Sequence, residues 1–373
     1  MSWPTAQEFN EAIQSPVTAF SDPLLRNGSV ECNQLGLPKP RAGNFATVYK
    51  ITNGTRAWAV RCFNSELRDQ EERYRAIGAY LNRISLSYMT EFQYLPRGIR
   101  LRGSWYPILK MEWVHGEPLN IFVERNLGKP QQLLKLAKDW VLMAQKLRSA
   151  GLAHGDLQHG NVLVSNAGLK LVDYDGMYVP ELQGKYSNEL GQQNYQLPQR
   201  KATDFGPFLD NFSEWVVLVT LLALSADPKL WQSFRGGDEC LLFRKRDFEA
   251  PDQSQVFRAL ERIANEQVVV LVGMLKRAAF LSPAMVPPLD TSLFGGFEIE
   301  LPISAPASSW LDDHIPKQGM ARGTSSSTRA PASSATAHDW ILDFTEVPVS
   351  IALQGNFRQE RVSLLASVAL VAL

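Results

Sequence analysis

Residues 154–176 read HGDLQHGNVLVSNAGLKLVDYDG and hold two acidic centres and one asparagine amide, each beside an apolar run. The short runs VLV and LV are typical of buried strands, and the NAG between them is typical of a turn. The pattern predicts a hairpin with Asp156 and Asn161 on the loop before it and Asp173 directly after it.

This set of side chains matches the needs of phosphoryl transfer from a nucleotide. One carboxylate orients the attacking hydroxyl, while an amide and a second carboxylate hold magnesium against the phosphates. A polar hairpin with solvated acids is the alternative, and it is the better interpretation of any one of these residues alone. The whole string with this spacing is more specific, and it predicts phosphoryl-transfer chemistry.

The HGD string at 154–156, with Asn161 shortly after it and Asp173 beyond, resembles the catalytic loop and metal-binding loop of the protein-kinase superfamily. The resemblance implies that Asp156 orients the nucleophile and that Asn161 and Asp173 bind Mg²⁺ beside ATP. Eukaryotic-type protein kinases usually have arginine at the position of Gly155. Glycine is common there in aminoglycoside- and choline-kinase-like relatives.

Length and composition suit a cytoplasmic enzyme. The 373 residues are enough for a two-lobed enzyme of roughly 250–300 residues and a tail. Lys and Arg together equal Asp and Glu together at 38 each, so no global field favours nucleic acid or an anionic membrane. The three cysteines lie far apart, which fits a reducing compartment and disfavours a zinc framework. The N-terminal residues lack a signal pattern, and the longest apolar run, 215–223, is too short to span a bilayer.

A second hairpin is predicted near residue 50, where two alternating apolar strands flank a Thr-Asn-Gly turn. By position it resembles the kinase glycine-rich loop and the strand that follows. Only the central glycine, Gly43, is present, because Arg41 and Ala46 stand at the other two glycine positions. The resemblance implies nucleotide contacts from Gly43, Phe45, Val48, Ala59 and Arg61.

Arg61 stands where the kinase family has the phosphate-binding lysine. Arginine keeps the positive charge but is longer, planar and forked, so the exchange is not conservative at a shaped site. In kinases this cation pairs with a glutamate of the next helix, which is predicted here at 68–84 from its apolar spacing. Glu71 and Glu72 are both candidates for that partner, and the pattern does not choose between them. A solvated helix face is the alternative for both, and it is the better interpretation of either one alone.

The strand at 106–117 resembles the kinase strand that runs into the hinge between the two lobes. The resemblance implies that Met111 lies at the back of the adenine pocket. It also implies that Glu112 and Val114 bound the segment whose backbone C=O and N–H groups contact the adenine edge. A buried edge strand is the alternative interpretation of this run alone.

The chain that follows is predicted to be mainly helical. Apolar spacing after Pro130 predicts a helix at 130–150 that supports the catalytic loop. The string at 195–198 resembles the end of a protein-kinase activation segment, with Gln199 where the family has glutamate. Asp210 opens a strongly apolar helix, is an N-cap candidate, and by resemblance holds the catalytic-loop backbone. These last two features favour the protein-kinase branch over the aminoglycoside-kinase branch. Further helices are predicted near 228–234, 253–264 and 267–279.

We interpret the chain as α+β, with a bilobal protein-kinase-like fold. Phe20, Leu24 and Leu25 of an N-terminal extension are candidates to pack on the first lobe. The expected parts are the extension at 1–39, a small β-rich N-lobe at 40–114, a larger helical C-lobe at 115–282, a flexible Pro/Ser/Ala-rich linker at 283–338, and a small segment of unassigned role at 339–373.

The expected activity is transfer of the ATP γ-phosphate to a serine or threonine hydroxyl of a protein, with ATP and Mg²⁺ bound and no nucleic-acid or membrane partner. The expected site consists of the catalytic residues Asp156, Asn161 and Arg61 and the metal ligands Asn161 and Asp173, with Asp175 as a second metal candidate. Arg61, the glycine-poor loop and Gln158 in place of a lysine are departures from the family. They leave open a pseudokinase that binds nucleotide or holds a partner. A small-molecule phosphotransferase is the other alternative.

Overall fold

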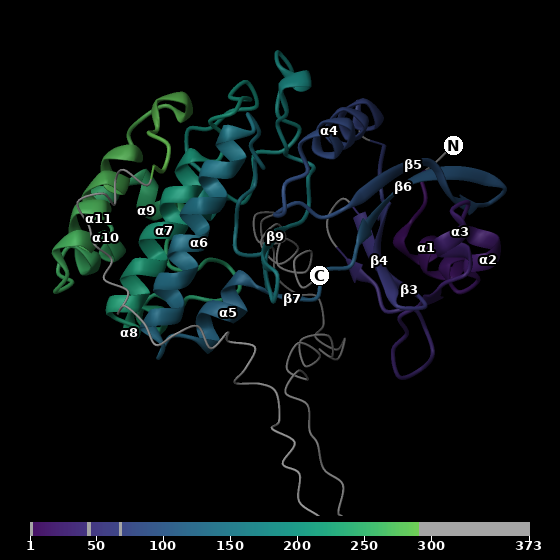
Figure 1. Ribbon diagram of the computed structural model, residues 1–373, viewed down its shortest axis with the longest axis horizontal. Helices are drawn as coiled ribbons and strands as arrows, with labels where there is room; N and C mark the ends of the chain where they lie inside the picture. Colours follow the sequence, from purple (N-terminus) through teal and green to yellow (C-terminus); the bar gives the residue numbers. More distant parts are fainter. Residues whose placement is uncertain (1–2, 43–45, 67–68, 291–373) are drawn as a thin grey trace, which may run out of the picture. The chain divides into compact units, whose positions relative to one another are not determined.

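The computed structural model describes residues 3–42, 46–66 and 69–290, which contain both sheets and helices (Figure 1). Gly43 and Phe45, two of the expected nucleotide contacts, lie outside the described residues. So do the expected C-terminal segment at 339–373 and most of the linker at 283–338. The described chain is a mixed α+β protein built on an antiparallel sheet and a set of helices.

The antiparallel sheet has the strand order β1-β3-β4-β6-β5, and β2 also pairs with β3. The expected hairpin is confirmed, since β3 and β4 pair around a turn at Gly54, whose φ of 61° lies in the left-handed region. β5 has a bulge between Leu95 and Ile99, which accommodates Pro96 within the strand. The strands are β1 (Ser29–Val30), β2 (Arg41–Ala42), β3 (Ala46–Asn53), β4 (Arg56–Phe63), β5 (Phe92–Leu101) and β6 (Ser104–Glu112).

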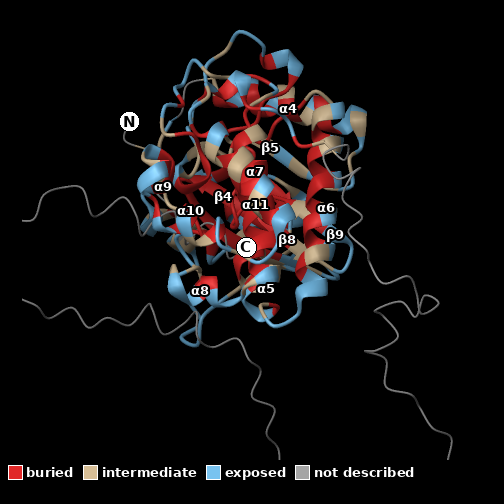
Figure 2. Cartoon of the chain, turned by 90° about the vertical axis from the view of Figure 1, so that its left-hand side faces the viewer, coloured by how far each residue is buried: buried red, intermediate tan, exposed pale blue. Residues whose placement is uncertain are grey.

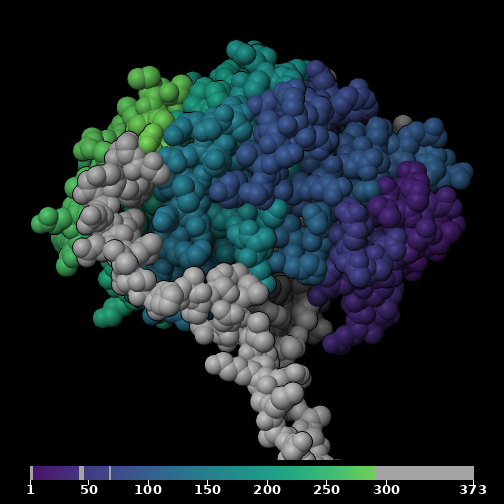
Figure 3. Space-filling model, viewed as in Figure 1, coloured from purple at the N-terminus to yellow at the C-terminus, as the bar shows by residue number. Residues whose placement is uncertain are grey.

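One face of this sheet is covered by the N-terminal extension, drawn in purple (Figure 3). Its helices are α1 (Ala6–Ile13), α2 (Pro16–Ala19) and α3 (Pro23–Arg26). Phe20 and Leu25 are buried against the sheet as expected, whereas Leu24 is 41% exposed and that part of the prediction is wrong. An ion pair of 2.6 Å between Lys110 Nζ and Asp22 Oδ2 ties α3 to β6. The extension therefore belongs to the core of this sheet.

The opposite face of the sheet packs on α4 (Gln70–Ile84). Side chains alternate along a strand, so Val48 of β3 and Ala59 and Arg61 of β4 lie on this face, while Tyr49 lies on the face of the extension. Three of the expected nucleotide contacts therefore share one face of the sheet.

The chain after β6 is mainly helical. α7 (Asn211–Ala226) is apolar all round and is buried because it packs against both α6 (Pro130–Ser149) and α11 (Glu266–Ala278). Figure 2 shows exposed residues on the outer loops and outer helix faces, with buried residues inside them. The predicted helices in this part are confirmed as α6, α7, α8 (Lys229–Ser233), α10 (Gln255–Leu260) and α11, although α10 is shorter than expected. The helices α5 (Leu119–Arg125) and α9 (Lys245–Glu249) were not predicted. Within the described ranges, no helix combines the length and apolar character needed to cross a membrane.

Candidate active site

A second, three-stranded sheet carries the candidate catalytic residues. Asp156 and Asn161 precede the predicted hairpin and Asp173 follows it, so this prediction is confirmed. The backbone N–H of Val172 donates to the carbonyl oxygen of Asn161 at 3.0 Å, which brings the two ends of the stretch together. The strands are β7 (Gly116–Pro118), β8 (Val162–Ser165) and β9 (Gly168–Leu171), in the order β7-β8-β9.

Asp210 holds the backbone of the loop that leads to Asp156. Its carboxylate accepts the backbone N–H of His154 and, at 2.8 Å, that of Gly155. From the other side, Arg200 Nη1 donates to the Gly155 carbonyl oxygen at 2.9 Å. Asp210 is the N-cap residue of α7, as predicted, but its side chain makes no capping hydrogen bond and is used by the loop instead.

Gly155 allows an unusually close backbone contact. Its φ is 80°, and a Cβ atom built there would lie 2.1 Å from the carbonyl oxygen of Gly176. No side chain fits at that distance, so the arginine found at this position in eukaryotic-type protein kinases is sterically excluded here. Through this contact the loop with Asp156 packs directly against the turn that contains Asp173 and Asp175.

Both carboxylate oxygens of Asp156 are used within the chain. Asn161 Nδ2 donates to Asp156 Oδ2 at 2.9 Å and to the Asp156 carbonyl oxygen at 3.0 Å. The backbone N–H of Gln192 donates to Asp156 Oδ1 at 2.7 Å, a contact that the sequence did not predict. Burial raises the pKa of Asp156 to about 6, partly offset by the Gln192 bond, and the side chain keeps some exposure.

This raised pKa gives a pH prediction. Asp156 must be ionised to accept a proton from a hydroxyl, so transfer should rise with pH through about 6 and level off above it. A rate profile of kcat/KM at constant Mg·ATP concentration measures this. A rate that is unchanged or higher at pH 5 than at pH 7 would contradict the assignment of Asp156 as the proton acceptor.

Arg61 lies between two carboxylates. Its Nη1 is 2.5 Å from Asp173 Oδ1, and its Nη2 forms a 2.5 Å ion pair with Asp175 Oδ2. Asp175 also accepts the Tyr74 hydroxyl from α4. The two acids raise the pKa of Arg61 against the effect of burial, which acts in the opposite direction, so the guanidinium stays charged. The sequence predicted Arg61 and Asp173, and gave Asp175 only as a second metal candidate.

Neither glutamate of α4 pairs with Arg61, which agrees with the alternative that both lie on a solvated helix face. Glu71 pairs instead with Arg75 at 2.5 Å, and Glu72 pairs with Lys185 at 2.7 Å. Both glutamates lie on the exposed face of α4, because its buried face presents Tyr74 toward the sheet. Tyr74 is one of the apolar positions from whose spacing the helix at 68–84 is predicted. That spacing assigns the Tyr74 hydroxyl no polar contact.

The expected adenine-side residues are present but differ in burial. Val48, Ala59 and Met111 are buried in the same cluster as α4. Glu112 is exposed, and its backbone N–H already donates to the Glu91 carbonyl oxygen at 2.8 Å. Val114 is half-buried at the end of β6. The structure does not test the adenine contacts predicted for Glu112 and Val114, and they stay predictions.

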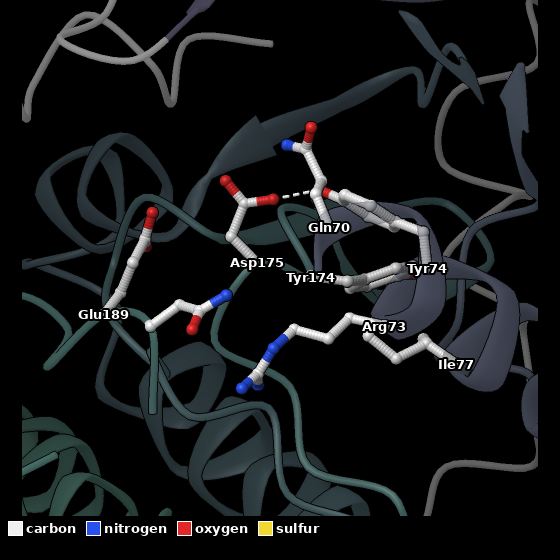
Figure 4. A pocket seen from close by; sticks show the side chains of 8 residues that line it. Gln70, Arg73, Tyr74, Ile77, Tyr174, Asp175 and Glu189 are labelled. Carbon is white, nitrogen blue, oxygen red and sulfur yellow. Dashed lines mark hydrogen bonds between the residues drawn. The ribbon is translucent and has the colours of Figure 1, made fainter. Parts of the chain in front are cut away.

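A small cavity adjoins the Arg61 cluster on the α4 side (Figure 4). Its volume of about 60 Å³ has room for a few water molecules and none for a nucleotide. Burial, followed by the nearby Asp175 and Asp173, raises the pKa of Glu189 in its wall to about 9. The cavity is lined by Gln70, Arg73, Tyr74, Ile77, Tyr174, Asp175, Asn188 and Glu189.

The segment that contains Gln192 is fastened to α4. Arg73 Nη2 donates to the Tyr186 carbonyl oxygen at 2.6 Å, and the Lys185–Glu72 ion pair lies beside it. Further along, Gln199 Nε2 donates to the Leu281 carbonyl oxygen at 2.6 Å. This neutral contact anchors the end of the segment.

Asn161 and Asp173 offer side-chain oxygen atoms to a magnesium ion. The Asn161 amide nitrogen faces Asp156, which leaves its oxygen as the atom for a cation. Asp173 supplies a carboxylate, and Mg²⁺ is usually held by one or two protein ligands together with phosphates and water. The residues therefore fit an ion that arrives with a nucleotide. Residues 3–42, 46–66 and 69–290 contain no group of three or more His, Cys, Asp or Glu side chains that could hold a metal.

Comparison with known proteins does not place the chain in a family. No protein-family model matches it, and a search of curated proteins found no match. The function proposed below therefore depends on the geometry around Asp156 and Arg61.

Proposed function

We propose that this chain is an ATP-dependent phosphotransferase with a bilobal protein-kinase-like architecture, acting on a serine or threonine hydroxyl of a protein. The observation that carries the proposal is the convergence of Asp156, Asn161, Asp173 and Arg61. One hairpin, one close glycine contact and the Asp210 anchor hold these residues together.

Each group has a role in this proposal. Asp156, held by Asn161 and by the anchored loop, accepts the proton of the attacking hydroxyl. Arg61 supplies positive charge to the phosphates from the face of the sheet that also carries Val48 and Ala59. Asn161 and Asp173 would hold Mg²⁺, which when bound neutralises the phosphate oxygens.

A scaffold without turnover is the second candidate, and two contacts favour it. Arg61 Nη1 already forms an ion pair with the Asp173 carboxylate, and the backbone N–H of Gln192 already donates to the Asp156 carboxylate. An acceptor hydroxyl and a nucleotide must displace both contacts before transfer. If they do not, the chain binds a partner through this fold and performs no chemistry.

Substitutions of Arg61 separate the two candidates. Arg61→Ala should lower turnover by about two decades, because the charge acts where negative charge gathers in transfer. Arg61→Lys should also fall short of the wild type, because one ammonium cannot reach both acids as the two guanidinium nitrogens do. The measurements are the rate of ATP turnover and the affinity for Mg·ATP. Should all three proteins bind Mg·ATP equally and none turn it over, the scaffold replaces the enzyme.

A further inference from the structure

We infer that Asp175 is the carboxylate that positions Arg61 for the nucleotide, in place of a glutamate on α4. The inference rests on the proposed function. It assigns Asp175 as a positioning residue that acts through Arg61, and it separates this role from that of Asp173, the metal ligand. The two acids are two residues apart in the chain and share one guanidinium. The sequence ranked Asp173 first as a metal ligand but assigned no contact with Arg61 to Asp175.

Asp175 is the more deeply buried of the two acids, and it alone of the two contacts α4, whereas Asp173 makes the hydrogen bond to Arg61. The Asp175 side chain is 6% exposed and contacts both the Arg61 guanidinium and the Tyr74 hydroxyl. Removing such a carboxylate leaves a buried cation without one of its partners, which is costly. Asp175 is therefore built to stay with Arg61.

Asp173 is the acid that can exchange its partner. Its side chain is 18% exposed, three times as much as that of Asp175 at 6%, and its backbone has a φ of 65° in the left-handed region. Residues kept in that region without glycine are concentrated at functional sites. When a cation reaches Asp173, Arg61 retains Asp175 and stays in place beside the phosphates.

α4 supports this arrangement through a neutral group. The Tyr74 ring stacks on Tyr94 of β5 at 5.5 Å with an interplanar angle of 9°, which fixes the position of its hydroxyl. Glu71 and Glu72 point away to Arg75 and Lys185. The position of Arg61 should therefore be insensitive to the charge of either glutamate.

The test is the dissociation constant of ADP, measured by calorimetry on the full chain, once with Mg²⁺ and once with a chelator. Asp175→Asn should weaken ADP by about tenfold in both conditions, which corresponds to roughly 1.4 kcal/mol. Asp173→Asn should instead abolish the difference between the two conditions. Glu71→Gln and Glu72→Gln are matched controls that remove one carboxylate each from α4, and both should bind ADP as the wild type does.

A second variant protects the test against misfolding and against simple charge effects. Tyr74→Phe keeps the stacked ring and the net charge but removes the hydrogen bond to Asp175. It should weaken the binding of ADP in both conditions, but by less than Asp175→Asn does. Wild-type affinity for ADP in both Asp175→Asn and Tyr74→Phe would overturn the inference. So would a loss of ADP affinity in Asp175→Asn that appears only with Mg²⁺. A loss of ADP affinity in Glu71→Gln or Glu72→Gln would also overturn it. If the wild type binds no ADP in either condition, the proposed function fails and the inference fails with it.

Discussion

Replacing Asp156 with asparagine is expected to lower phosphoryl transfer by about three decades, within the range that a positioned general base contributes. Asparagine has the same shape, so its side-chain oxygen can still accept the N–H of Gln192, and the loop remains anchored by Asp210. Its amide nitrogen then replaces the oxygen that accepts from Asn161 Nδ2, and Asn161 keeps its bond to the backbone carbonyl oxygen of residue 156. An amide cannot take up the proton of an attacking hydroxyl. The loss should therefore appear in the rate and leave the affinity for ATP near that of the wild type.

Initial rates with γ-labelled ATP, at saturating Mg²⁺, measure this effect. Asp139→Asn is the matched control, because it makes the same chemical change at an acid on α6 that pairs only with the exposed Lys135. It should leave the rate unchanged. An Asp156→Asn protein that keeps more than about one tenth of the wild-type rate would show that Asp156 is not the base.

The second large effect is structural. Gly155→Ala should lower the free energy of unfolding by about 4 kcal/mol or more, or prevent folding, because its Cβ would lie 2.1 Å from the Gly176 carbonyl oxygen and 2.7 Å from its carbon. Both atoms belong to the backbone, so neither can rotate away. The left-handed φ of 80° adds to the cost.

Gly184→Ala is the control that isolates the close contact. Gly184 has a similar φ of 85°, but a Cβ there would meet nothing within 4 Å. Its substitution should cost only about 1–2 kcal/mol, the ordinary price of a left-handed alanine. Urea unfolding of both proteins decides the matter. Equal losses at the two positions would mean that the 155–176 contact relaxes and does not hold the two loops together.

The strongest local patterns predicted the elements that carry the site. Apolar runs separated by turn residues predicted both hairpins, and the spacing after Pro130 predicted α6. Two short helices in the chain after β6 were not predicted. α5 begins without a side-chain cap, and α9 has only five residues, so neither has a periodic pattern long enough to detect.

Within the site, the residues that were predicted correctly are those that lie close together in the sequence. Asp156, Asn161 and Asp173 belong to one short string, whereas the partner of Arg61 depends on which face of α4 meets the sheet. The same limit applies to Gln192, whose backbone N–H reaches Asp156 from 36 residues away. Glu189 was missed for the same reason, since its pKa is raised by burial and by acids distant in the chain. Contacts of this kind are decided by tertiary packing, which no local pattern records.

The most direct test of the account is a single-turnover experiment with γ-labelled ATP, Mg²⁺ and an excess of the full-length chain, at pH 7. The account predicts that label leaves ATP for a protein hydroxyl or for water in the wild type. It also predicts that Asp156→Asn binds ATP as tightly and releases label far more slowly. Label retained on ATP in both proteins, with ATP bound equally by each, would contradict the claim that Asp156 and Arg61 form a phosphotransfer site.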